Sequence, residues 1–593
     1  MPANPSVDHA QARGWSVLTR LLGTFLRPYS WKAGLVVVLL MVQAIGNLYL
    51  PNLSGDVINN GVAKGNIGYI WRTGGVMLGI VFVLGVLAVV TVYHASRVST
   101  WVAADLRAAI YRRVQGFSNR EMTRFGIPSL ITRNINDVAQ IEIFLENALS
   151  QLVVAVLMSV GGMIMAVREG PRLSLLLLVA IPAMAVIIVV TLIMTLPLFR
   201  SIQGQIDRIN QVMREQITGV RVIRAFLRTP FEQARFRDVN ADLTKTWRRV
   251  ARIFAVVLPL LIAIFNLASV GIIWFGGRLV SEGSMPIGNM TAFLIYILQI
   301  LLYVLVAVSV LIQVPRAVAS AERIAQVVDA VPAITEPSRP VVPASVTGTV
   351  ELRHVTFGYP GSERPVLNDL TLTLRPGQVN AIIGGTGSGK TTLINLILRF
   401  FDATDGILLV NGTDVREQSA EQLWATIGLV PQAAFLFSGT VASNLRLGRS
   451  AATEGQLWHA LDVAQANDFV ASMPGRLDAP IDQGGTNVSG GQRQRLSIAR
   501  ALVRRPSLYL FDDCFSALDP ATDARLRHAL RAEARDAAVV IATQRASTIV
   551  HADQIIVLDA GRVAGAGTHE QLLATCGPYQ EIVASQLGEG AAA

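Results

Sequence analysis

Long apolar runs recur through the first half of the chain, whereas the second half alternates short apolar segments with polar turns. Six of the runs approach the roughly 20 residues that a helix needs to cross a bilayer. Buried helices of soluble domains are rarely so long and so evenly apolar. The pattern predicts six membrane-spanning helices, at Ala33–Leu53, Gly74–Tyr93, Ala148–Val167, Leu173–Leu196, Phe254–Phe275 and Met290–Val314.

The N-terminal segment, residues 1–30, divides into a polar start and an amphipathic stretch. Residues 1–14 are polar, and we expect them to be loose. From Trp15 to Ser30, apolar residues recur at helical spacing with arginines between them. Two interpretations fit this pattern: an amphipathic helix on the cytoplasmic membrane surface, or a cytoplasmic extension of the first span.

The loops between the spans differ in charge. Those joining spans two to three and four to five are long and rich in arginine, whereas the opposite loops are short. The basic residues of the short loops are Lys64, Arg72, Arg168, Arg172 and Arg278. Because basic loops stay on the cytoplasmic side, both long loops and both chain ends are predicted to be cytoplasmic.

The two long loops also carry apolar residues at helical spacing, so the spans are expected to continue as helices beyond the membrane. Each helical pair must then reverse direction, and we place the turns near Phe125–Ser129 and near Arg214–Gly219. Two interpretations remain for each turn: a short helix that docks on the C-terminal domain, or a plain connection.

Composition agrees with the membrane prediction: 52% of residues are hydrophobic and 16% are charged. The net charge of +10 is explained by the arginine-rich loops, so no nucleic-acid partner is expected. Two cysteines, Cys514 and Cys576, imply no disulfide framework and fit a reducing compartment. No cleaved signal peptide is expected, because no early apolar core precedes a small-residue cleavage site.

Changes in composition divide the chain further. The membrane domain covers residues 31–330 and is followed by a proline-rich linker at 331–347. An ordinary balance of charge, short strands and turns then marks a second domain at 348–587. A small-residue tail, 588–593, closes the sequence.

The second domain contains a phosphate-loop pattern, G-x-x-x-x-G-K-[ST], at Gly384–Thr391. An apolar strand, Val379–Ile383, precedes it, and a helical segment beginning at Thr392 follows. Glycines let consecutive N–H groups surround phosphate oxygens, and the helix N-terminus adds positive potential. Lys390 is expected to reach the β- and γ-phosphates, and Thr391 to hold Mg²⁺. The plain alternative is a glycine-rich turn.

Other segments supply further parts of a nucleotide site. Tyr359 precedes the loop and is a candidate for stacking on adenine, its alternative being a surface strand tyrosine. Leu508–Asp512 is predicted to be a buried strand that ends in a carboxylate. A carboxylate in that position is a suitable ligand for Mg²⁺. Gln432, the segment Ser489–Gln492 and the segment Ser516–Asp519 complete the series.

Together these motifs resemble the nucleotide-binding domain of ABC transporters, and the S-G-G-Q signature at Ser489–Gln492 is the most specific of them. With six spans ahead of one such domain, the whole chain resembles a type IV exporter half-transporter. The resemblance implies a multi-domain fold: an all-α six-helix transmembrane domain plus an α/β phosphate-loop domain, RecA-like, with an antiparallel subdomain and a helical subdomain. It also implies that two nucleotide-binding domains pair head to tail, so a second half-transporter is required.

The resemblance assigns roles to individual residues. ATP and Mg²⁺ are the expected cofactors, and Thr391, Gln432 and Asp512 are expected to hold the metal. The residues expected to contact ATP are Tyr359, Gly384, Gly385, Thr386, Gly387, Ser388, Gly389, Lys390, Thr391 and Thr392, with Ser489, Gly490, Gly491, Gln492 and Asp519 acting on the nucleotide of the opposite site.

Two catalytic positions depart from the family pattern. Asp513 stands where a glutamate general base is expected, and its shorter side chain withdraws the carboxylate from the attacking water. Gln544 stands where a histidine is expected; it still donates a hydrogen bond but cannot become cationic. With Gln432, these are the expected catalytic positions. Asp482–Gly485, before the signature, also lacks the usual acidic–basic pattern.

These departures resemble the degenerate half of a heterodimeric exporter. The hypothesis is a slow or inert ATP site in this chain and a signature that completes the active site of a different subunit. The alternative is a homodimer whose unusual residues suffice for hydrolysis.

The substrate is least defined. The spans hold few charges and many aliphatic, methionine and aromatic side chains, which suits a hydrophobic or amphipathic compound, drug-like or lipid-like. The alternative for most of these residues is that they face lipid or neighbouring helices. We predict export across the plasma or inner membrane. The alternatives are a dedicated lipid, fatty-acid or peptide carrier, with import as an option, and an ATP-gated channel or regulatory subunit, which the lack of pore charges disfavours. The spans exclude a soluble DNA-associated ATPase.

Overall fold

The computed structural model describes the backbone of residues 5–587 and the side chains of 14–586 apart from Leu196 and Arg200. The predicted tail 588–593 therefore lies outside the described residues, as do residues 1–4 of the predicted loose start. The chain forms two compact units. One comprises the chain up to Gln115 and Pro128–Ala330, and the other comprises Gly116–Ile127 and the chain from Val331.

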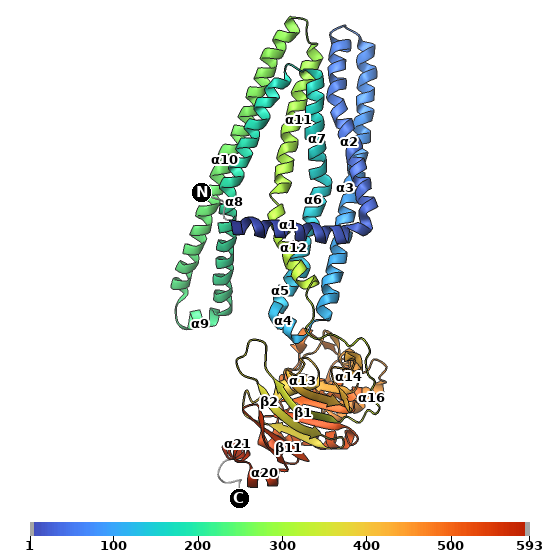
Figure 1. Ribbon diagram of the computed structural model, residues 1–593, viewed down its shortest axis with the longest axis vertical. Helices are drawn as coiled ribbons and strands as arrows, with labels where there is room; N and C mark the ends of the chain where they lie inside the picture. The colour runs from blue at the N-terminus through green and yellow to red at the C-terminus, as the bar shows by residue number, and fades with distance from the viewer. Residues whose placement is uncertain (1–4, 588–593) are drawn as a thin grey trace. The chain divides into compact units, whose positions relative to one another are not determined.

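The described part of the first unit is helical (Figure 1). Its helices are α1 (Pro5–Leu26), α2 (Ser30–Asp56), α3 (Ile67–Gln115), α5 (Ile127–Thr132), α6 (Val138–Asn147), α7 (Val153–Glu169), α8 (Ser174–Thr218), α9 (Val220–Ala225), α10 (Thr229–Ser281), α11 (Ile287–Leu311) and α12 (Val314–Val328). Short helical turns join some of them: η1 (Arg27–Tyr29) is a 3-10 turn, and η2 (Val57–Val62), η3 (Arg133–Asp137) and η4 (Ala148–Leu152) are π-helical.

Six helical stretches in the described residues are long and apolar enough to cross a membrane. Each predicted span lies within one of them, except that the fourth prediction begins one residue early, at Leu173. The number and order of the predicted spans are confirmed. The apolar pattern identified them because a helix that crosses lipid must remain apolar for its whole length.

Helix α1 differs from the prediction of a loose start, because it is helical from Pro5. It runs crosswise to α2, and η1 separates the two (Figure 1). Its Leu18 and Leu21 are buried, and Arg20 forms a 2.5 Å ion pair with Asp329 at the end of α12. Of the two interpretations of this segment, the crosswise course fits a separate surface helix rather than an extension of the first span.

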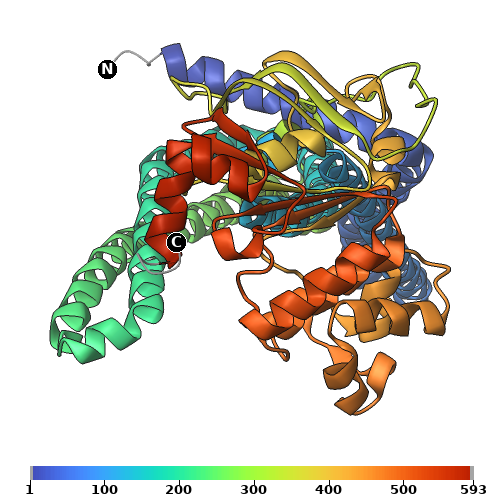
Figure 2. The ribbon, with the colours of Figure 1, turned by 90° about the horizontal axis from the view of Figure 1, so that it is seen from below.

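Helices α8 and α10 form a long antiparallel pair joined by α9 (Figure 1, Figure 2). The predicted turn at Arg214–Gly219 begins too early, because α8 continues to Thr218 and the reversal runs from Gly219 through α9. The other predicted turn, Phe125–Ser129, contains Gly126, whose φ of 73° ends the short helix α4 (Asn119–Phe125). Gly126 supplies the backbone conformation that other residues disfavour.

Helix α4 belongs to the second unit although it lies within the first half of the sequence. Ser118 caps it in a reciprocal capping box with Glu121. The buried Glu121 carboxylate also accepts a 3.2 Å hydrogen bond from the backbone N–H of Ala333, in the proline-rich linker. The linker and α4 are thus joined within one folded body.

The described residues of the second unit form three sheets with helices around them. Its strands are β1 (Val350–Phe357), β2 (Leu367–Leu374), β3 (Val379–Ile383), β4 (Asp405–Val410), β5 (Thr413–Asp414), β6 (Ile427–Val430), β7 (Gly439–Thr440), β8 (Pro480–Ile481), β9 (Leu508–Asp512), β10 (Ala538–Thr543), β11 (Gln554–Asp559) and β12 (Arg562–Gly567). Its helices after α4 are α13 (Lys390–Ile397), α14 (Ala420–Ala425), α15 (Val441–Arg446), α16 (Glu454–Val463), α17 (Asn467–Ser472), α18 (Gly490–Arg504), α19 (Pro520–Glu533), α20 (His569–Thr575) and α21 (Gly577–Leu587).

The largest sheet has the order β12-β11-β3-β10-β9-β6, in which only β12 is antiparallel to its neighbour. The antiparallel sheet β2-β1-β4-β5 forms a separate layer. Helices α15 to α18 pack together through buried leucines and alanines. The predicted fold class, with a RecA-like core and antiparallel and helical subdomains, is confirmed.

A glycine contact holds α2 against α11 in the first unit. A Cβ atom added to Gly288 would lie 2.1 Å from the carbonyl oxygen of Gly55, so the two backbones touch. Beside them, Asn59 donates to Asn289 at 2.8 Å. Deeper in the pair, the buried Tyr296 hydroxyl donates to the carbonyl oxygen of Leu48 at 2.7 Å.

This packing also separates the methionine and aromatic side chains of the spans into buried and exposed ones. Met158 and Tyr296 are buried in the core shared by α2, α7 and α11. Phe82, in contrast, is 75% exposed on α3. Residue type alone did not separate packed side chains from exposed ones.

Replacing Gly288 with alanine is expected to destabilise the first unit. The new methyl group would force α2 and α11 apart, at a cost of about 1–3 kcal/mol. Thermal unfolding of the purified protein in detergent should show a lowered midpoint. Gly79→Ala on α3 is the matched control, because a Cβ atom there meets nothing within 4 Å. Equal losses in the two variants would contradict the role of this contact.

Candidate functional site

The predicted nucleotide residues follow four parallel strands of the large sheet. The phosphate loop follows β3, Gln432 follows β6, Asp512 ends β9 and Gln544 follows β10. Because parallel strands point the same way, these residues all lie at the carboxyl edge of one sheet. Strand β9 is buried at every residue, so the carboxylate at its end marks the border between the core and the site.

The phosphate loop has the backbone that its glycines predict. Gly387 and Gly389 adopt φ angles of 81° and 102°, in the left-handed region. A Cβ atom added to Gly384 would lie 2.2 Å from the Leu558 carbonyl oxygen, whereas one added to Gly385 would meet nothing within 4 Å. The loop is therefore packed tightly at its base and open where it faces away from the sheet.

Lys390 lies at the centre of this loop. Its ammonium group donates to the carbonyl oxygens of Gly384 and Gly385, each at 2.8 Å. Burial lowers the pKa of Lys390, and the nearby carboxylates Asp513 and Asp512 oppose that shift. A buried cation enclosed by backbone groups is suited to binding an anion.

Two oxygen-bearing side chains meet beside the lysine. The Thr391 hydroxyl donates to an Asp512 carboxylate oxygen at 3.1 Å. Burial raises the pKa of Asp512, while the bond from Thr391 lowers it. This hydroxyl–carboxylate pair matches the oxygen ligands that Mg²⁺ prefers. Gln432, the third predicted metal ligand, has its Nε2 atom 3.5 Å from an Asp513 oxygen.

Asp513 has an unusual backbone for a residue other than glycine. Its φ angle is 45°, in the left-handed region, which aspartate tolerates better than most residues. Its N–H donates to the Ala542 carbonyl oxygen at 2.8 Å, and Thr543 Oγ1 lies 3.5 Å from its carboxylate. The carboxylate is thus placed between Gln432 on one side and β10 on the other.

Gln544 reaches the phosphate loop. Its Oε1 atom accepts a 3.3 Å hydrogen bond from the Thr386 hydroxyl. The backbone around it is held by Gln586 on α21, which donates to the Gln544 carbonyl oxygen at 2.7 Å and accepts from the Ala546 N–H at 2.8 Å. We call Gln544–Thr548 the switch segment; one side chain of the last helix bridges two of its backbone groups.

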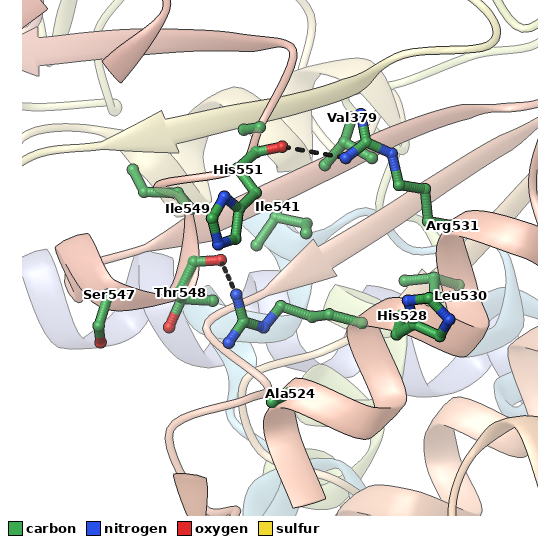
Figure 3. Close-up of a pocket in the computed structure, with 12 residues that line it drawn as sticks. Val379, Ala524, His528, Leu530, Arg531, Ile541, Ser547, Thr548, Ile549 and His551 are labelled. Atoms are coloured by element: carbon green, nitrogen blue, oxygen red, sulfur yellow. Dashed lines mark hydrogen bonds between the residues drawn. The ribbon is translucent and has the colours of Figure 1, made fainter. Parts of the chain in front are cut away.

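The far end of the switch segment is held by α19. Arg527 donates to the Thr548 carbonyl oxygen at 2.8 Å, and Arg531 donates to the His551 carbonyl oxygen at 3.4 Å. Both bonds border a cavity of about 350 Å³ between α19 and this segment (Figure 3). Asp519, one of the residues predicted to contact ATP, immediately precedes the same helix.

Asp519 acts as the N-cap of α19 and accepts from the Thr522 N–H at 2.9 Å. Hydrogen bonds from Thr522 lower the pKa of the Asp519 carboxyl group. In the signature segment, Ser489 caps α18 in the same manner through a capping box with Gln492. This geometry places Gly490 and Gly491 in the first turn of α18, where backbone N–H groups attract anions.

Tyr359 lies on the antiparallel layer. Its hydroxyl group is 3.1 Å from the Thr392 hydroxyl, in the first turn of α13. Its ring packs edge-on against Phe357 and Phe401 and is 36% exposed. The tyrosine is therefore held close to the helix that follows the phosphate loop, with part of its ring open to solvent.

Family models and known proteins identify this arrangement. Residues 33–304 match the model of the ABC transporter transmembrane region, and residues 367–516 match the ABC transporter model. An ABC transporter ATP-binding protein of Mycobacterium tuberculosis is 46% identical over 574 residues, which cover 96% of this chain and 98% of that protein. The chain belongs to the ABC transporter family.

Two further comparisons extend this result. A fatty acid ABC transporter ATP-binding/permease protein of Mycobacterium tuberculosis is 33% identical to this ABC transporter over 454 residues, covering 76% of the chain and 71% of the relative. The solved structure of a bacterial Atm1-family ABC exporter with ATP bound matches with a TM-score of 0.79 at 23% identity, covering 95% of this chain and 99% of that one. The fold is that of a type IV exporter half-transporter.

These findings make the chain a multi-pass membrane protein with an ATP-binding domain that couples ATP hydrolysis to transport. Sequence reasoning missed Gln586 and Arg527 of this ABC transporter, which hold the switch segment. Each acts on the segment from another helix and bonds there to backbone atoms, so no motif marks it.

Gln586→Ala is expected to speed hydrogen exchange in the switch segment about fivefold, because the Ala546 N–H loses its acceptor and one hydrogen bond contributes about 1 kcal/mol. Exchange mass spectrometry on the intact protein measures this rate. Ser585→Ala is the matched control, since that hydroxyl bonds only to the Ile582 carbonyl oxygen of its own helix. Unchanged exchange in Gln586→Ala would show that the contact does not stabilise the segment.

Proposed function

We propose that this ABC transporter is one half of a heterodimeric exporter. It binds ATP through Tyr359, the phosphate loop and Asp512 in a slow site, and its signature, Ser489–Gln492, completes the active site of a different subunit. The observation that carries the proposal is the joint replacement of both catalytic positions, by Asp513 and Gln544, in a site whose binding residues are intact.

The surroundings of Asp513 support a slow site. An aspartate carboxylate is one methylene closer to the backbone than that of glutamate, and here it lies beside Gln432 and Thr543. A misplacement of about 1 Å lowers a rate about a hundredfold. Gln544 contacts Thr386 as a neutral hydrogen-bonding group and offers no positive charge to a developing anion.

Two surfaces support the need for a second subunit. The capped N-terminus of α18 is exposed at Gly490. Within that cap, Ser489 and Gln492 form hydrogen bonds with one another. In the first unit, the tip of the α8–α10 pair exposes large apolar side chains, with Phe226 73% and Leu227 85% exposed. Exposed apolar clusters of this kind mark interaction sites.

Mg²⁺ belongs to the same proposal. Thr391 and Asp512 would hold it, and the ion would neutralise phosphate charge. Gln432, whose amide lies beside Asp513, is the third proposed ligand of the metal. The nucleotide-binding domain and both chain ends are proposed to be cytoplasmic, in the plasma or inner membrane.

The proposed cargo is a hydrophobic or amphipathic compound, drug-like or lipid-like, that is exported. Few charges lie within the spans, which disfavours an ion path. A dedicated lipid or fatty-acid carrier is the second candidate, and the relative that carries the name of a fatty acid transporter favours it. Binding of ATP across two nucleotide-binding domains would draw them together and drive the change between inward- and outward-facing states.

The test compares the purified chain with the complex isolated together with its partner subunit. ATP hydrolysis by the chain alone is expected to be about a hundredfold slower than by the pair, and the double change Asp513→Glu with Gln544→His should raise it by a similar factor. Hydrolysis by the unaltered chain alone at the rate of the pair would overturn the proposal.

Ser489→Ala is expected to lower ATP hydrolysis by the pair at least tenfold, because the hydroxyl group contacts the nucleotide held by the partner. The change also removes a helix cap, which costs about 1 kcal/mol. Ser419→Ala controls for this loss, since Ser419 forms an equivalent capping box on α14. Steady-state ATPase assays should show near-normal activity in the control; equal losses would assign the effect to stability.

Asp512→Asn and Asp513→Asn are expected to differ in the binding of ATP. The first removes a carboxylate that would hold Mg²⁺, so addition of the metal should no longer tighten binding. The second should leave the Mg²⁺ effect intact, because Asp513 contacts Gln432 and Thr543 rather than Thr391. Titration with a fluorescent ATP analogue, with and without Mg²⁺, distinguishes them, and identical behaviour would remove Asp512 from the metal site.

A further inference from the structure

A cluster of aromatic and basic side chains lies where α1 turns into α2. Tyr29, in the η1 turn, stacks on Trp101 of α3 with ring centroids 5.4 Å apart. Its hydroxyl group donates to an Asp105 carboxylate oxygen at 2.9 Å. These contacts attach the turn to α3 and place the Trp101 ring at the centre of the cluster.

Two cations are held on that ring. The Lys32 ammonium nitrogen lies 3.7 Å from the Trp101 ring centroid, and the Arg97 guanidinium carbon lies 4.6 Å from it. Arg97 also donates to the Tyr93 hydroxyl at 2.9 Å. A ring face attracts a cation but carries no negative charge that would neutralise it.

No carboxylate neutralises these charges within the described residues. The ion pairs found there do not include Lys32 or Arg97. Asp105, the acidic member of the cluster, accepts the bond from Tyr29. Lys32 and Arg97 are thus two positive groups of the cluster that form no ion pair among the described residues.

The cluster is open at its outer side. Trp31 is 67% exposed, and Tyr93 and Arg97 are exposed as well. Lys32 immediately precedes the first span, and Arg97 follows the second within about one helical turn. Aromatic residues at the end of a span gather at the level of lipid headgroups. The same level is marked by α1, which runs crosswise to α2 (Figure 1).

We propose that Lys32 and Arg97, held on Trp101, bind the phosphate of an anionic phospholipid in the leaflet that contains α1. The acyl chains would lie along α2 and α3, whose outer faces are apolar, and Trp31 would lie at the headgroup boundary. A zwitterionic lipid would bind less well, because its own cation offsets the phosphate. This inference does not depend on the asymmetry of the two ATP sites.

The test uses the full-length protein in detergent, titrated with dioleoylphosphatidylglycerol and, separately, dioleoylphosphatidylcholine, with bound lipids counted by native mass spectrometry. The anionic lipid is expected to be preferred. In Lys32→Gln with Arg97→Gln, that preference should fall about thirtyfold, because each basic group beside an anionic headgroup contributes a factor of about five. Added salt should weaken the preference in the unaltered protein.

The matched control is Lys64→Gln with Arg72→Gln, which removes a lysine and an arginine near the opposite ends of the same two spans. It should leave the preference unchanged. Trp101→Leu should weaken binding and Trp101→Phe should largely restore it, since only the latter keeps a ring for the cations. Equal losses in the test and control variants would overturn the proposal. It would also be overturned if Lys32→Gln with Arg97→Gln released the partner subunit and left phosphatidylglycerol binding unaltered.

Discussion

The nucleotide site depends on the parallel pairing of β3, β9 and β10. Val379 to Ile383 pair in register with β10, and Leu508 to Asp512 pair with the other edge of that strand. This register brings the phosphate loop, the two carboxylates and the start of the switch segment to one edge of the sheet. A shift of one residue would turn the buried side chains of these strands toward the wrong face.

Buried charge at this edge is tolerable because the charges compensate one another. Lys390 lies near Asp512 and Asp513, and their mutual attraction opposes the cost of burial that shifts the pKa of Lys390 downward and that of Asp512 upward. A bound nucleotide would add negative charge beside the lysine, and a metal ion would add positive charge beside Asp512. The site is thus arranged around charges that its ligands would complement.

Much of this architecture could be predicted from sequence because it depends on local pattern. Spans are continuous in sequence, and the phosphate loop requires glycines at fixed spacing, as the backbone of Gly387 and Gly389 shows. Contacts between distant segments were not predictable. Three of these contacts depend on packing that no periodicity encodes. They are the hydrogen bond from Tyr296 to Leu48, the position of Gln432 beside Asp513, and the bridge from Gln586 to the switch segment. The roles of Asp513 and Gln544 in catalysis stay predictions.

The position of α4 in the second unit affects the order in which its contacts form during synthesis. This helix leaves the ribosome long before the domain to which it belongs, and its capping box with Ser118 can form at once. The second acceptor site of the Glu121 carboxylate, however, is occupied only when Ala333 has been synthesised. The contacts of Glu121 are therefore completed late in biosynthesis. A chain truncated within the membrane domain would lack the Ala333 N–H that donates to this carboxylate.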